Sequence, residues 1–231
     1  IPNLTMDEMA GKLDELREMG IRNVWLLPIF LHSDRSIYNT EDMSRIDPRY
    51  GDDEAIRRWI RRAHELGMRV MFDYVPHGPE PGTPLAETYR EWCSVKPDGS
   101  LQIEWDCVSF DMANPEYADY VYMIVRDHVA RFDVDGARID TAMGGLPNWS
   151  PYEGNRPSNS NLKGGIAVTK AIRDGFVDSG KNPIVLPENF NPVPLYFPHT
   201  DVYYDMALYR ALFELNRAGL SEAEYAAELA Q

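Results

Sequence analysis

The sequence predicts an α/β protein of the (β/α)8 barrel type in which the barrel is incomplete. Apolar strand-like runs alternate with amphipathic helical patterns along the 231 residues, and this alternation requires parallel strands with helices packed outside them. Polar and charged side chains recur where the strands end, which is the end at which such barrels carry their functional groups. No glycine fingerprint follows the first strand, as a doubly wound nucleotide-binding sheet would need. We expect residues 1–231 to form one partial barrel domain.

The first elements alternate regularly. Thr5 opens a capping box with Glu8, and a helix should run from there to Gly20. A buried strand is expected over residues 23–29, a helix over 52–66, and a second strand over 68–75. The apolar residues that recur at helical spacing in the first helix are Met6, Met9, Leu13, Leu16 and Met19.

The alternation then pauses in a long irregular segment after the strand that ends near Val75. Residues 78–113 show no clear period and read as a short inserted excursion, and connections of this length are more often functional than accidental. They contain the only two cysteines, Cys93 and Cys107, which are compatible with a disulfide or with two separate thiols. Asn114 then caps a helix that should end near Phe132.

The rest of the chain yields three more strands. One covers residues 134–140, one ends at Glu188 after a helix over 166–177, and a fifth is expected over 202–206. Helices should follow. Five strands are found where a barrel needs eight, so we expect the missing strands to lie elsewhere in a longer chain.

The strand at 134–140 carries the most specific chemical signal. Arg138 and Asp140 stand two residues apart and therefore face the same side of the strand. An arginine beside a carboxylate should keep it ionised and depress its pKa, as a carboxylate nucleophile requires. Glu188 ends a neighbouring apolar run and could face Asp140 across a substrate. Taken singly, Arg138 and Asp140 could form a structural ion pair, and Asp73 or Glu188 could be a helix cap.

Composition excludes some partners. The net charge of −14 argues against nucleic acid, which requires clusters of lysine and arginine. No run approaches the roughly 18 apolar residues of a membrane helix, and no signal peptide is visible. We expect a soluble protein that does not bind membranes, and the sequence does not indicate its compartment.

Four blocks in the chain resemble the α-amylase superfamily, glycoside hydrolase family 13, across nearly its whole length. Residues 38–51 (YNTEDMSRIDPRYG) resemble the segment that supplies an aromatic platform for the sugar. Residues 73–77 (DYVPH) resemble the first signature block, and residues 136–140 (GARID) the second. Glu188 matches the glutamate of the third. Each block alone is weak, but their order and spacing make a specific combination.

This resemblance implies a retaining glycosidase or transglycosylase that acts on α-glucosidic oligosaccharides without a cofactor. Asp140 would be the nucleophile and Glu188, with a pKa raised by partial burial, the acid/base, their carboxyl groups about 5–5.5 Å apart. Arg138 would keep Asp140 charged. The residues expected to bind the substrate are Tyr38, by stacking on the sugar, and Asp73 and His77, by hydrogen bonds to its hydroxyls.

Three departures from the family pattern matter. The third carboxylate has no match, since His199 and Asp201 are separated and precede the fifth strand. Pro76 replaces an asparagine that ligates calcium in many relatives, so no metal site is expected, and Thr-Ala-Met after Asp140 puts starch specificity in question. Two alternatives therefore stay open. One is a catalytically silent barrel that binds sugar or a protein, and the other is a metal-dependent barrel enzyme that uses Asp73, His77 and Glu188.

Overall fold

A computed structural model describes residues 4–150, 158, 163–190 and 194–229. Its centre is a four-stranded, fully parallel sheet in the order β1-β4-β7-β8. Within the described residues this sheet does not close on itself, so β1 and β8 are its edges. The strands are β1 (Asn23–Leu26), β4 (Arg69–Tyr74), β7 (Gly136–Ile139) and β8 (Ile184–Pro187).

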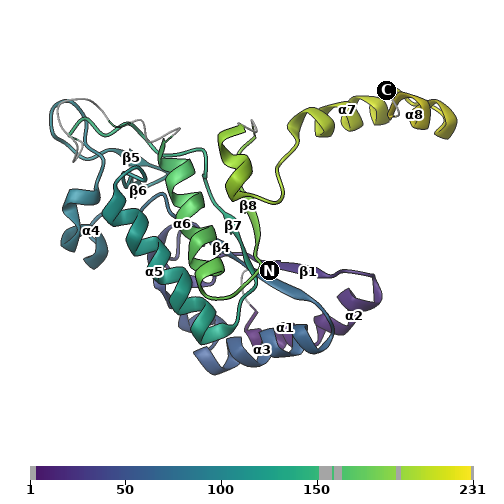
Figure 1. Cartoon of the computed structure of the whole chain (residues 1–231), viewed down its shortest axis with the longest axis horizontal. Helices are drawn as coiled ribbons and strands as arrows, with labels where there is room; N and C mark the ends of the chain where they lie inside the picture. Colours follow the sequence, from purple (N-terminus) through teal and green to yellow (C-terminus); the bar gives the residue numbers. More distant parts are fainter. Residues whose placement is uncertain (1–3, 151–157, 159–162, 191–193, 230–231) are drawn as a thin grey trace.

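Helices connect these strands on one face of the sheet (Figure 1). The connections pass through α3 (Asp53–Glu65), α5 (Pro115–Phe132) and α6 (Gly165–Asp178), and α5 packs along α6. The first connection also contains a hairpin of β2 (Phe30–His32) and β3 (Thr40–Ile46), followed by the turn η1 (Pro48–Tyr50). These repeated strand-helix-strand units confirm the predicted partial (β/α)8 architecture.

Alternation along β4 separates the apolar core from the functional face. Phe72 and Tyr74 point toward the helices and contact the imidazole of His128 on α5, while Asp73 points to the opposite face of the strand. His128 is fully buried, and burial lowers its pKa to about 3, so it is a neutral member of the core. The tight spacing of β7 and β8 depends on Gly136, since a Cβ there would lie 2.3 Å from the carbonyl oxygen of Ile184.

The N-terminal helix differs from its prediction. The capping box of Thr5 and Glu8 is confirmed, but the helix is divided at Gly11 into two pieces. Met6 and Leu13 are buried, whereas Met19, which was expected on the apolar face, is 75% exposed. Glycine lowers helix stability enough to permit a break at this position. The two pieces are α1 (Met6–Ala10) and α2 (Lys12–Glu18).

The excursion after β4 folds into small elements of its own. They are α4 (Pro84–Thr88), η2 (Arg90–Trp92) and an antiparallel hairpin of β5 (Ile103–Glu104) and β6 (Cys107–Val108). Cys93 and Cys107 are buried free thiols, which decides against the disulfide. Burial raises the pKa of both thiols, to about 11 and about 12 respectively.

The expected fifth strand over 202–206 is absent. The chain touches the edge of β8 only briefly, where Asp201 and Val202 donate backbone hydrogen bonds to the oxygen of Val185. The Asp201 carboxylate takes the Val185 N–H that a new strand would need. Asp205, within this segment, caps α7 by accepting a hydrogen bond from the Leu208 amide.

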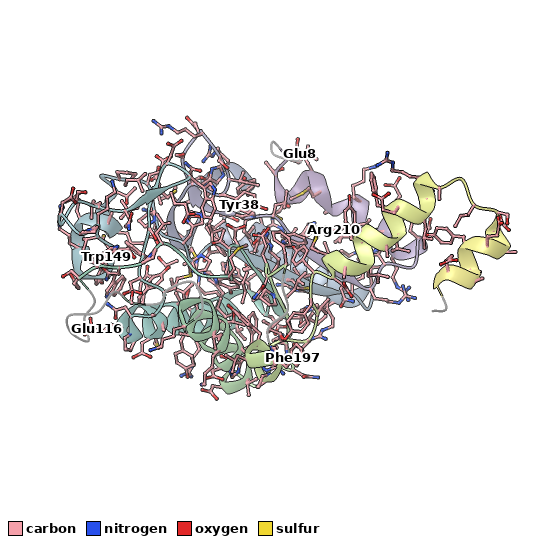
Figure 2. The ribbon with its side chains drawn as sticks, turned by 90° about the horizontal axis from the view of Figure 1, so that it is seen from above. Glu8, Tyr38, Glu116, Trp149, Phe197 and Arg210 are labelled. Carbon is pink, nitrogen blue, oxygen red and sulfur yellow. The ribbon has the colours of Figure 1, made fainter. Side chains whose placement is uncertain are left out.

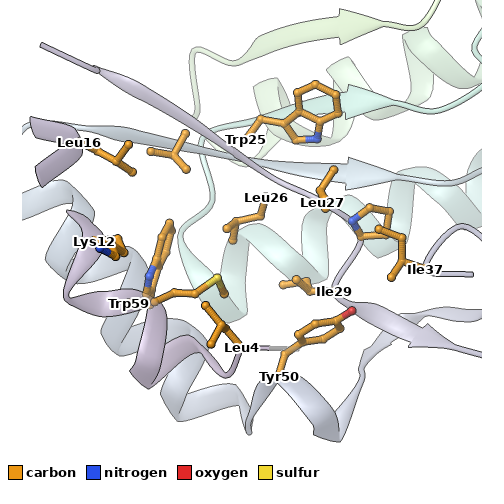
Figure 3. A pocket seen from close by; sticks show the side chains of 13 residues that line it. Leu4, Lys12, Leu16, Trp25, Leu26, Leu27, Ile29, Ile37, Tyr50 and Trp59 are labelled. Atoms are coloured by element: carbon orange, nitrogen blue, oxygen red, sulfur yellow. The ribbon is translucent and has the colours of Figure 1, made fainter. Parts of the chain in front are cut away.

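The C-terminal elements are η4 (Pro194–His199), α7 (Met206–Arg217) and α8 (Glu222–Leu229). The helices α7 and α8 extend away from the sheet, and α7 has no buried residue (Figures 1 and 2). At the opposite edge, beside β1, lies an apolar pocket of about 230 Å³ that includes Trp25, Leu26 and Trp59 (Figure 3). No helix in the described parts of the chain is long and apolar enough to cross a membrane.

Candidate active site

The carboxyl ends of three adjacent strands bring charged side chains together. The register pairs Asp73 on β4 with Arg138 on β7, and Ile139 on β7 with Pro187 on β8. Asp140 and Glu188 follow directly, and their backbone amides continue the ladder by donating to Tyr74 and Ile139. The backbone of the sheet therefore fixes both acids.

A single guanidinium organises this cluster. Nη1 of Arg138 lies 3.0 Å from Oδ1 of Asp73 and 2.5 Å from Oδ1 of Asp140, and Nη2 lies 2.8 Å from Oε2 of Glu188. The side chains of Asp73 and Arg138 are 0% and 5% exposed, and those of Asp140 and Glu188 are 10% and 20% exposed. Three carboxylates thus share one buried cation, which leaves an excess of negative charge.

The expected low pKa of Asp140 is wrong in direction. Burial raises the pKa of Asp140 to about 6, although Arg138 lowers it, and the neighbouring Glu188 raises it further. Burial likewise raises the pKa of Asp73 to about 7 against the effect of Arg138. One guanidinium does not offset the desolvation of these carboxylates and their mutual repulsion. The site therefore carries a proton more readily than an isolated ion pair would.

Glu188 is held differently from Asp140. Its Oε2 atom accepts a hydrogen bond of 3.0 Å from the amide of Thr141, besides the contact with Arg138. Thr141 has a left-handed backbone with φ of 46°, a conformation that β-branched residues rarely adopt outside constrained sites. The strained turn after Asp140 thus directs an amide toward the second acid.

His77 and Tyr38 complete the cluster. Nε2 of His77 lies 3.8 Å from Oδ2 of Asp140, and burial lowers the pKa of His77 to about 4, so the imidazole is neutral at pH 7. The Tyr38 hydroxyl donates to Oδ2 of Asp73 at 3.2 Å. The structure therefore brings all six predicted site residues together: Tyr38, Asp73, His77, Arg138, Asp140 and Glu188.

Two contacts were not predicted. Nε1 of Trp25 donates to Oδ2 of Asp73 at 3.1 Å, with Arg138 5.1 Å from its ring centre, and Nε of Arg138 donates to the hydroxyl of Tyr204 at 3.4 Å. Trp25 pairs in register with Met71, two residues before Asp73. Since residues two apart share a face, an inward indole next to Asp73 could have been found from the strand register. Nothing in the sequence indicates Tyr204.

The residues that might have supplied a third carboxylate have other partners. Asp201 accepts hydrogen bonds from Arg173, at 2.7 Å, and from the amide of Val185. His199 lies in η4. Among the residues that the structure describes, no three His, Cys, Asp or Glu side chains are grouped so as to hold a metal ion.

Known proteins match this chain in sequence. The family model of the α-amylase catalytic domain matches residues 5–80. A cyclomaltodextrinase of Geobacillus thermopakistaniensis is 33% identical over 150 residues, which are 56% of this chain and 25% of that enzyme. An intracellular maltogenic amylase of Bacillus subtilis is 31% identical over 150 residues, covering 58% of this chain and 26% of that enzyme.

A solved structure also resembles this fold. The crystal structure of a maltogenic α-amylase from Thermotoga neapolitana superposes with a TM-score of 0.72 at 26% identity, covering 97% of this chain and 50% of that one. The chain thus spans about a quarter of the length of its curated relatives and half of this solved structure. The partial parallel sheet, the strand-end cluster and these matches agree, and together they show a partial (β/α)8 barrel that is similar to the catalytic domain of α-amylases.

Proposed function

We propose that the protein carrying this chain is a retaining glycoside hydrolase or transglycosylase that acts on α-glucosidic oligosaccharides through a glycosyl-aspartate intermediate. The observation that carries the proposal is the pair Asp140 and Glu188, which stand at adjacent strand ends and share the guanidinium of Arg138. Retaining glycosidases need two carboxyl groups facing one glycosidic bond. The names of the relatives, cyclomaltodextrinase and maltogenic amylase, support the substrate class.

We infer different roles for the two oxygens of Asp140 from their different contacts. Oδ1 is bound to Arg138, whereas Oδ2 faces His77. In the first step, Oδ2 attacks the anomeric carbon as the bond to the leaving oxygen breaks. Glu188 donates its proton to that oxygen, so the departing sugar leaves as a neutral alcohol.

The second step reverses these roles. Glu188, now a carboxylate, takes a proton from water or from an acceptor sugar, whose oxygen attacks the anomeric carbon. The bond to Asp140 breaks and the carboxylate returns to its pairing with Arg138. Two inversions give net retention of configuration. The acceptor, water or sugar, decides between hydrolysis and transfer.

The remaining cluster residues would bind the sugar in the cleavage position. The neutral imidazole of His77 can donate a hydrogen bond from Nε2 to a hydroxyl without adding charge. Asp73 would accept a hydroxyl hydrogen bond while it is held by Trp25 and Arg138. Tyr38 would present its ring to the sugar. We further propose that residues 78–113 form an insertion within the barrel domain and contribute to the rim of the site.

The test uses the full-length protein and an activated α-glucoside. We expect Asp140→Asn and Glu188→Gln each to lower kcat by about 10⁴-fold, and mass spectrometry to find a trapped glycosyl adduct on Asp140. Asp205→Asn is the matched control, because this carboxylate caps α7 outside the cluster. A folded protein with no turnover on any α-glycoside would contradict the proposal and leave a sugar-binding or scaffolding barrel.

A further inference from the structure

The turn between β5 and β6 has an unusual composition. Its two residues, Trp105 and Asp106, have φ angles of 50° and 63°, as a two-residue hairpin turn with both residues left-handed requires. Asn-Gly is the common choice for such turns, and a bulky residue with positive φ is an outlier. Strained backbone of this kind concentrates at functional sites. Turn formation alone therefore does not explain why a tryptophan occupies this position.

Burial in the core does not explain the tryptophan at position 105 either. Trp105 is 54% exposed, so much of its indole remains in water and gains little from burial. Trp92, in the same excursion, shows the contrast, since it is 4% exposed and stacks on Tyr89 with ring centres 3.9 Å apart. Trp92 is a core residue, whereas Trp105 presents its ring to solvent.

The position of this exposed ring is specific. The indole of Trp105 meets the imidazole of His77 edge-on, with centroids 5.7 Å apart. His77 is in turn 3.8 Å from Oδ2 of Asp140. The ring therefore borders the cluster, and His77 lies between it and the proposed nucleophile.

Contacts between two segments bring the turn to the same side of the site as the loop that carries Tyr38. Glu80, at the start of the excursion, accepts hydrogen bonds from Ser33 at 2.7 Å and from Asn39 at 2.9 Å. Asp106 lies 3.9 Å from Arg35 in that loop. Trp105 of the excursion therefore lies next to His77, and Tyr38 of the other loop lies next to Asp73.

We propose that Trp105 is a stacking platform for the glucosyl unit next to the one bonded at Asp140, and that it sets the preference for oligosaccharides over single glucosyl units. The inference rests on the proposed function of the site. A pyranose ring presents an apolar C–H face, and an exposed indole offers a large apolar surface with a negative π-face that complements it.

The test compares two substrates on the full-length protein. Maltotriose supplies a second sugar unit, whereas α-glucosyl fluoride supplies only one. We expect Trp105→Ala to lower kcat/KM for maltotriose about tenfold, mainly through KM, and to change that for α-glucosyl fluoride by less than about twofold. Trp105→Phe should restore most of the maltotriose activity. Trp149→Ala is the matched control, because Trp149 is also 50% exposed and lies away from Tyr38 (Figure 2).

A stability measurement separates a ligand-binding ring from a structural one. We expect Trp105→Gly to lose the maltotriose preference while its thermal midpoint stays equal to or above that of the unmodified protein, because glycine relieves the left-handed strain. Equal losses on both substrates, or unchanged activity on both, would overturn the proposal. If the unmodified protein turned over neither substrate, the proposed function would fail. Even then, the platform can be tested by the quenching of tryptophan fluorescence on addition of maltotriose. Quenching that disappears in Trp105→Phe would support the platform, and quenching that persists in this variant would overturn it.

Discussion

The two ends of the sheet both carry ionic clusters, but their charges are balanced differently. At the amino end, the carboxylate of Asp135 is bound by Nε2 of His64 at 2.7 Å, by Nζ of Lys181 at 3.2 Å and by the amide of Val70 at 2.9 Å. Burial alone would raise the pKa of Asp135, but these hydrogen bonds and charges outweigh burial, so the net result is a lowered pKa. At the carboxyl end, three carboxylates share Arg138, and the pKa values of Asp73 and Asp140 are raised.

This difference separates an ion cluster that stabilises the fold from the one that we propose takes part in catalysis. The carboxylate of Asp135 has enough donors to remain charged at little cost. The raised pKa values of Asp73 and Asp140 mean that their charged forms cost stability. The number of hydrogen-bond donors and cations around each carboxylate decides the direction of its pKa shift, whereas the presence of an ion pair alone does not.

Removal of the central cation should have the largest effect. Arg138→Met leaves three carboxylates without their shared cation, so we expect a loss of about 3–5 kcal/mol in the free energy of unfolding at pH 8 and of activity by about 10³-fold or more. Urea denaturation at pH 8 and at pH 5 tests the cause, because protonation of the carboxylates should recover part of the loss at pH 5. Lys181→Met at the amino end should cost only about 1 kcal/mol, because Asp133, its other partner, is largely exposed. Equal losses for the two variants would remove the distinction between the clusters.

Neutralising one acid at each end should change stability in opposite directions. Asp140→Asn relieves repulsion and should raise the free energy of unfolding at pH 8 by about 1 kcal/mol while abolishing turnover. Asp135→Asn weakens the interactions with His64 and Lys181 and should lower it by about 1–3 kcal/mol. Chemical denaturation of both variants in one buffer decides the point. A stabilised Asp135→Asn protein would contradict this account.

The pH dependence should differ between the ends as well. Asp73 and Asp140 have pKa values raised to about 7 and about 6, so the stability that their protonated forms contribute is present at low pH and is lost as the pH rises through 6 to 7. Asp135 has a lowered pKa, so its contribution is present above about pH 4 and is lost as the pH falls below that value. The profile of kcat/KM should fall on the acidic side with an apparent pKa near 6, since the nucleophile must be ionised. Asp140→Asn should flatten the stability profile between pH 5 and 8, and an unchanged profile would show that Asp140 does not titrate there.

The smallest effect should come from the exposed pair of Arg35 and Asp106. Both side chains are more than two-thirds exposed and their charged atoms are 3.9 Å apart. Solvent screens such pairs, so Arg35→Ala should change the free energy of unfolding by less than about 0.5 kcal/mol. Thermal denaturation at low and high salt provides the measurement. A larger, salt-dependent loss would mean that exposed pairs also matter to this fold.

The sequence predicted those elements whose signals are local. Capping residues and strand alternation located β4, β7 and β8, and the spacing of Arg138 and Asp140 predicted that they share a face. The missing fifth strand depends on a tertiary contact, because the Asp201 side chain occupies the edge of β8. The raised pKa of Asp140 could not be foreseen for the same reason, because it reflects how many carboxylates converge on one guanidinium.

The absence of a side chain at Gly136 has a stereochemical consequence. It allows β7 to approach β8 where a Cβ would meet the backbone of Ile184 at 2.3 Å, and Asp140 and Glu188 follow these two strands. A separation of about 5–5.5 Å between such carboxyl groups favours direct attack, whereas about 6.5–9.5 Å admits a water molecule and yields the opposite anomer. A methyl group at position 136 would push the strands apart, so under the proposed mechanism the hydrogen atom of this one glycine would help to determine which anomer is released.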